Sequence, residues 1–140
     1  MNWCVRGLAA TIDAPRICSL ERIPRGPKWS DVQRLIVASR GHATTDIRDH
    51  AILSLLVVFG LRSGEVRLLR LEDIDWEKET IHVRRPKRRK SQNYPLVREV
   101  GEAILRYLRK VRPRCREREV FLTLKQPYGR LSSTGRVAQP

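Results

Sequence analysis

The spacing of apolar residues predicts a first helix that ends near Ser39. Ser30 is followed three residues later by Gln33, and this pattern is typical of a capping box that opens a helix. The apolar face of this helix is expected to consist of Val32, Leu35 and Ile36. Residues 1–28 contain three prolines and have weak periodicity, so we expect a linker there.

A second helix is predicted to begin at Thr45-Asp46 and to run through residues 51–59, which are almost entirely apolar. A helix that is apolar on all sides is typical of the centre of a core. Gly60 can take the left-handed conformation that ends a helix, and Ser63 can cap the next one. The apolar residues of that next helix are Val66, Leu68 and Leu69.

After Leu71 the apolar residues alternate with polar ones, which indicates strands. Ile74 belongs to the first alternating run, Ile81 and Val83 belong to the second, and residues 93–96 supply a third strand. Polar residues between the first two runs indicate a turn, so these strands should pair antiparallel.

Helical spacing resumes at Val97 and is ended by Pro113, and residues 120–122 form one more short apolar segment that we expect to be buried. The pattern as a whole predicts an α+β chain, mostly helical, with a small three-stranded antiparallel sheet.

Charge changes this picture, because the chain carries a formal net charge of +14. Residues 84–118 contain 14 Lys or Arg and 3 Asp or Glu, whereas residues 29–61 contain equal numbers of both signs. A concentrated basic region is typical of a protein that binds nucleic acid, although a merely basic, solvated surface has the same composition. Aromatic residues are only 6% of the chain, which disfavours an RNA-binding surface built by stacking.

Metal and membrane sites are not indicated. Cys4, Cys18 and Cys115 are far apart and form no CxxC pair, and the three histidines lack ligand spacing, so we expect no structural metal. The apolar run over residues 51–61 is much shorter than the roughly 20 residues that span a bilayer. The start of the chain lacks a signal-peptide pattern, so we expect a cytoplasmic protein.

Arg62 lies where the central helix meets the next one, three residues before Glu65. At this spacing the carboxylate can hold the guanidinium, and a fixed guanidinium near a helix N-terminus suits a phosphate. The pattern is equally compatible with a structural ion pair that closes the corner.

The segment "RRPKRRK" places six cations in seven residues between two predicted strands. A hairpin tip of this composition is expected to contact phosphates through Arg84, Arg85, Arg88, Arg89 and Lys90. A lysine in such surroundings has a lowered pKa and can also donate a proton as a general acid.

The stretch "RDHAILSLLVVFGLRSGEVRLLRLEDIDWEKETIHVRRPK", followed by "YPL", resembles the first half of the catalytic domain of tyrosine recombinases, the phage-integrase-like enzymes. The resemblance covers roughly residues 29–131. It implies a metal-free, cofactor-free DNA strand exchange in which Arg62 binds the scissile phosphate and Glu65 supports it. The hairpin lysine that protonates the leaving 5′ oxygen corresponds to Lys87, with Lys90 as the alternative.

The chain departs from the family pattern in its second half. No histidine follows His82, so the family's His-x-x-Arg motif is absent from the sequence, and Tyr94, Tyr107 and Tyr128 all precede its expected place. We expect packing or loop roles for these tyrosines and no nucleophile in this chain.

The resemblance therefore implies a truncated catalytic domain over residues 29–140, with residues 1–28 as a linker or the remnant of an N-terminal DNA-binding domain. Such a fragment is not expected to complete a reaction alone. Its expected partners are double-stranded DNA in the nucleoid and either other integrase protomers or a separate C-terminal half. A non-catalytic basic DNA-binding module, or a decoy on recombination sites, is the alternative.

Overall fold

The computed structural model describes residues 26–85 and 90–132. The elements in chain order are α1 (Trp29–Ala38), α2 (Thr44–Phe59), α3 (Ser63–Arg67), the 3-10 turn η2 (Leu71–Asp73), β1 (Ile74–Asp75), β2 (Thr80–Arg85), β3 (Lys90–Pro95) and α4 (Arg98–Lys110). The sheet is antiparallel with strand order β1-β2-β3. The predicted α+β class is confirmed.

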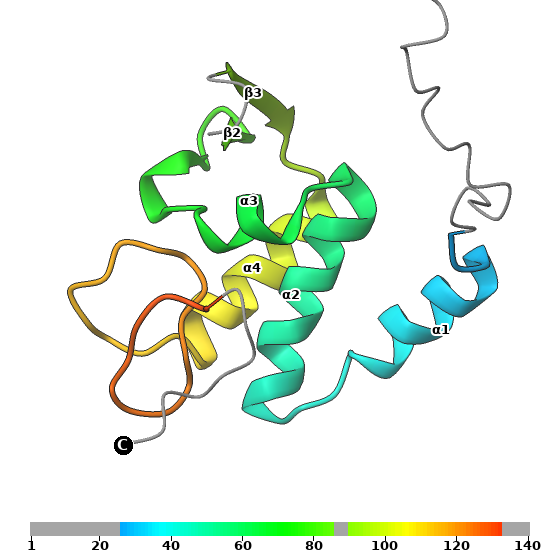
Figure 1. Ribbon diagram of the computed structural model, residues 1–140, viewed down its shortest axis with the longest axis horizontal. Helices are drawn as coiled ribbons and strands as arrows, with labels where there is room; N and C mark the ends of the chain where they lie inside the picture. The colour runs from blue at the N-terminus through cyan, green and yellow to red at the C-terminus, as the bar shows by residue number, and fades with distance from the viewer. Residues whose placement is uncertain (1–25, 86–89, 133–140) are drawn as a thin grey trace, which may run out of the picture.

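The core lies where α2 and α4 pack against each other, with the sheet at one end of this pair and the chain after α4 looping beside it (Figure 1). The side chains at its centre come from α2, β2, α4 and the segment that follows α4. Ala51, Leu55, Ile81, Ile104 and Phe121 are all 0% exposed. Residues distant in sequence therefore share one core, which fixes the α2–α3 corner relative to the sheet.

The apolar run of α2 forms the central helix, as predicted, but it is not buried on every side. Its inner face is buried, but Ile52 and Leu56 are only partly covered and Val58 is 48% exposed. The apolar pattern identified the central helix correctly, whereas its burial depends on which elements pack around it.

The prediction that Ser30 caps α1 is wrong. The helix begins at Trp29, so Ser30 lies inside the first turn, and Lys28 occupies the N-cap position without a side-chain hydrogen bond. None of the residues of α1 is buried, and Leu35 on its predicted apolar face is 53% exposed. Figure 1 shows α1 extending away from the α2–α4 pair.

The chain after α4 is attached through Tyr107. Its ring stacks on that of Phe121 with the centroids 5.2 Å apart, and its hydroxyl accepts a hydrogen bond from the backbone N–H of Leu122 at 3.2 Å. Burial raises the pKa of the Tyr107 hydroxyl. The segment Val120, Phe121 and Leu122 is fully buried, as predicted. Tyr107 is also fully buried, which agrees with the packing role expected for it.

His50 on α2 is partly buried and contacts Ser39 at the end of α1. Its Nδ1 lies 2.9 Å from the hydroxyl of Ser39, and that hydroxyl donates its single hydrogen to the carbonyl of Ile36, so Nδ1 acts as the donor. Burial, and then the nearby charges of Arg40 and Arg106, lower the pKa of His50.

We therefore predict that acid destabilises the chain through His50. Because its pKa is lower in the folded chain than in the unfolded chain, the unfolded chain binds more protons as pH falls below about 6.5. The thermal unfolding midpoint should decrease between pH 7 and pH 5, and this decrease should be smaller in His50→Gln. Identical pH profiles for the two proteins would contradict the assignment.

Candidate functional site

The corner between α2 and α3 is built by Gly60, Leu61 and Arg62. Gly60 has φ 61° and ψ 29°, the left-handed conformation predicted for it, and this ends α2. Leu61 is 5% exposed and anchors the turn in the core. The backbone of Arg62 is extended and occupies the N-cap position of α3, so the prediction of Ser63 as the cap is wrong.

Glu65 caps α3 and holds Arg62 at the same time. Its Oε2 accepts a hydrogen bond from the backbone N–H of Arg62 at 2.9 Å, and its Oε1 lies 3.2 Å from Arg62 Nη1. The Glu65 side chain is 6% exposed and the Arg62 side chain is 70% exposed. The predicted contact is present, and it fixes one edge of a guanidinium whose remaining N–H groups face solvent, where an anion can reach them.

Arg85 contacts the same carboxylate from the sheet. Its Nε lies 3.4 Å from Glu65 Oε1, and its guanidinium also donates to the hydroxyl of Tyr94 on β3. The Tyr94 ring packs against Phe59 at the end of α2, with the centroids 5.4 Å apart. Arg85 is only 25% exposed, so its position differs from the prediction of a charge presented at a hairpin tip.

The strand period could have identified this inward position. Ile81, Val83 and Arg85 alternate on one face of β2, and the first two are buried. Arg84 lies on the opposite face, with a 52% exposed side chain, and its Nη2 is 2.7 Å from Oδ1 of the buried Asp73. Asp73, which the sequence pattern did not single out, also accepts a hydrogen bond from the backbone N–H of Arg70 at 2.9 Å.

The rest of the basic segment is only partly described. Lys87, Arg88 and Arg89 lie outside the described residues. Lys90 begins β3, and its backbone is paired with that of Arg85 across the strand pair. The described part of β2 therefore ends at Arg85, which contacts Glu65.

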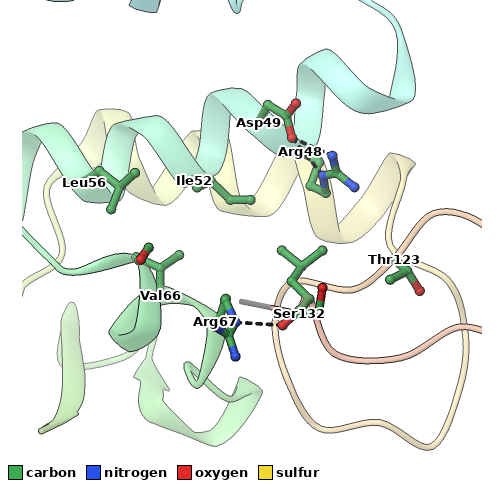
Figure 2. Close-up of a pocket in the computed structure, with 10 residues that line it drawn as sticks. Arg48, Asp49, Ile52, Leu56, Val66, Arg67, Thr123 and Ser132 are labelled. Atoms are coloured by element: carbon green, nitrogen blue, oxygen red, sulfur yellow. Dashed lines mark hydrogen bonds and ion pairs between the residues drawn. The ribbon is translucent and has the colours of Figure 1, made fainter. Parts of the chain in front are cut away.

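A cavity of about 500 Å³ lies between α2, α3 and the chain after α4 (Figure 2). Ile52, Leu56 and Val66 give it apolar walls. Two arginines also line it, but Arg48 is paired with Asp49 at 2.8 Å and Arg67 donates to the carbonyl of Leu131 at 2.7 Å. The apolar walls and the low exposure of Arg48, whose side chain is 19% exposed, make this cavity a poor phosphate site, so we place the candidate site at Arg62, whose side chain is 70% exposed.

The described part of the chain holds neither a metal-ligand cluster nor a membrane-spanning helix. Within residues 26–85 and 90–132, no group of three or more His, Cys, Asp or Glu side chains is arranged to hold a metal ion. In the same ranges, no helix is both long and apolar enough to cross a membrane.

The model of the family described as "Phage integrase family" matches residues 28–135. The chain belongs to the phage integrase family. The putative integrase/recombinase y4gC of Sinorhizobium fredii (strain NBRC 101917 / NGR234) is 52% identical over 97 residues, which are 69% of this chain and 50% of that protein. The tyrosine recombinase XerD of Ralstonia nicotianae (strain ATCC BAA-1114 / GMI1000) is 28% identical over 112 residues, which are 77% of this chain and 36% of XerD.

The fold of this phage integrase family member is also found in a solved structure. The crystal structure of XerA recombinase matches it with a TM-score of 0.66 and 24% identity, covering 87% of this chain and 40% of XerA. The helices and the small antiparallel sheet therefore have the same fold as the matched part of XerA. The chain spans half or less of the length of these relatives.

Proposed function

We propose that residues 29–140 supply the phosphate-binding part of a tyrosine recombinase active site that acts on double-stranded DNA. The observation that carries this proposal is the Arg62 guanidinium, which is exposed but fixed to a buried Glu65 carboxylate. A fixed cation can stabilise charge on a phosphate without first losing its own freedom. Residues 1–28 are proposed to be a linker or the remnant of an N-terminal DNA-binding domain.

In the proposed reaction a tyrosine hydroxyl attacks the scissile phosphorus and the bond to the 5′ oxygen breaks. Arg62 donates hydrogen bonds to the non-bridging oxygens as negative charge accumulates on them, and Glu65 holds Arg62 in place. Lys87, or Lys90 in its place, protonates the departing 5′ oxygen. The attacking tyrosine and the His-x-x-Arg motif would come from a separate C-terminal half or from another protomer.

A second candidate function is non-catalytic DNA binding, which the net charge of +14 favours. It needs the same basic surface but neither a held Arg62 nor a leaving-group acid. The two functions therefore differ in what loss of Arg62 does to binding and to cleavage.

We predict that the chain binds duplex DNA with a steep dependence on salt. Fluorescence anisotropy of a labelled duplex between 50 and 200 mM salt should give a slope of log affinity against log salt of about −0.9 for each phosphate neutralised. Single-stranded RNA of the same length should compete less well than unlabelled duplex. Equal competition would contradict a DNA function.

Arg62→Ala and Arg34→Ala form a matched pair for this binding test. Each removes one exposed cation, since the Arg34 side chain on α1 is 81% exposed, but Arg34 lies outside the proposed site. Arg62→Ala should reduce the magnitude of the salt slope by about 0.9, the contribution of one phosphate, whereas Arg34→Ala should change the slope less. Equal changes would show that Arg62 contributes only general charge.

A further inference from the structure

Two guanidinium groups share one buried carboxylate beside the proposed phosphate site. Glu65 Oε1 lies 3.2 Å from Arg62 Nη1 and 3.4 Å from Arg85 Nε. Arg62 reaches it from the α2–α3 corner and Arg85 reaches it from β2. The carboxylate therefore connects the helix corner to the strand that leads into the basic segment.

The two arginines differ in what else they can reach. The Arg62 side chain is 70% exposed, whereas that of Arg85 is 25% exposed and is also tied to the Tyr94 hydroxyl. Within the described part of the chain, Arg85 Nε is buried without a hydrogen bond. The negative charge of Glu65, 3.4 Å away, compensates for the burial of this group. Arg85 is thus held at two points, whereas Arg62 is held by Glu65 at one edge and keeps the rest of its guanidinium exposed.

We propose that Arg85 is a positioning residue for Arg62. Glu65 Oε2 accepts from the Arg62 backbone, and Arg85 shares Oε1 with the Arg62 side chain, so Glu65 does not form a tight two-pronged pair with the Arg62 guanidinium. The free N–H groups of Arg62 therefore stay directed at solvent. The three groups together carry a net charge of +1, whereas Arg62 and Glu65 alone would be neutral, so Arg85 also strengthens the attraction of an anion to Arg62.

The position of Arg85 is set by β3 and α2. The Tyr94 hydroxyl accepts from Arg85 and donates to Gln92 Oε1 at 3.1 Å, and its ring packs on Phe59. Tyr94 therefore has a tethering role. Tyr94, Arg85 and Glu65 therefore form a series of contacts that leads from β3 to Arg62.

The test measures phosphate binding at Arg62 itself and rests on the proposed function. The full chain, labelled with 15N in its arginine side chains, is titrated with inorganic phosphate while the Arg62 Nε–Hε signal is followed by NMR. We expect Arg85→Met to weaken the phosphate response of Arg62 about fivefold, and to slow rotation of the Arg62 guanidinium as it closes onto Glu65.

Arg84→Met is the matched control, because it removes a cation from the adjacent position of β2 that is paired with Asp73 and not with Glu65. It should weaken the phosphate response less than twofold and leave the rotation of Arg62 unchanged. Equal effects of the two variants on the phosphate response and on the rotation would overturn the proposal, because Arg85 would then contribute only its charge.

The failure of the proposed function gives a different result. If the Arg62 signal of the unchanged chain does not respond to phosphate, Arg62 is not the phosphate site, whereas slower rotation in Arg85→Met would still support the sharing of Glu65. Unchanged rotation would overturn that sharing.

If Arg85→Met does not fold, Tyr94→Phe is the second variant, because it removes only the hydroxyl that tethers Arg85. It should weaken the phosphate response of Arg62 and slow its rotation, both to a smaller extent than Arg85→Met. No change in either quantity would contradict the proposal.

Discussion

Arg62→Ala is expected to lower strand cleavage by about 100- to 1000-fold while weakening duplex binding only about threefold. In the proposed mechanism, Arg62 contributes one of many phosphate contacts to affinity, but it faces the negative charge that develops on one phosphate during the reaction. Its contact with Glu65 at 3.2 Å keeps it in place before the substrate arrives. Most of its effect should therefore appear in the rate of the chemical step.

Cleavage is measured by mixing the chain with the C-terminal half of a tyrosine recombinase that carries His-x-x-Arg and the attacking tyrosine. Product is scored as a covalent link between that half and a labelled DNA strand. Arg34→Ala, which removes an exposed cation from α1, is the control and should retain cleavage. Undiminished covalent product with Arg62→Ala would remove Arg62 from the mechanism and leave the DNA-binding module as the better description.

Much of the fold could be predicted because its signals are local. The left-handed turn at Gly60 needs a residue without a side chain, and the alternation through Ile81 and Val83 fixes which face of β2 is buried. The burial of α2 and α1 could not be predicted in the same way. It depends on which segments pack beside them, and the composition of a helix does not contain that information.

In the candidate site too, local contacts could be predicted from the sequence, whereas contacts between distant segments could not. The contact of Arg62 with Glu65 follows from a spacing of three residues across a helix start, so the sequence predicts it. Arg85 was predicted to be one of several similar hairpin cations, yet it pairs with a carboxylate twenty positions away. Only the folding of β2 against the α2–α3 corner brings these two groups together, although the alternation along β2 indicates that Arg85 points inward.

This arrangement also separates the roles of neighbouring arginines. Arg84 is held by Asp73 on one face of β2 and Arg85 is held by Glu65 on the other. Each buried carboxylate therefore restrains one arginine of β2.

Lys87→Ala is the second variant with a large expected effect, a loss of about 100- to 10,000-fold in cleavage in the same mixed assay. The reason is that the departing 5′ alkoxide is a strong base, which leaves slowly unless it receives a proton. Lys90→Ala is the matched variant, because it removes the other lysine of the same segment. A large loss for Lys90→Ala and a small one for Lys87→Ala would exchange their roles.

Sulfur in place of the 5′ oxygen separates a proton donor from a simple phosphate contact. A thiol has a pKa near 8.5, so the thiolate leaves without being protonated, and a variant that lacks only the general acid should recover most of its cleavage on this substrate. Arg62→Ala should not recover, because Arg62 acts on the non-bridging oxygens, which the substitution leaves unchanged. Recovery of cleavage in both variants, or in neither, would contradict the separate roles proposed for Arg62, which contacts the non-bridging oxygens, and Lys87, which protonates the leaving oxygen.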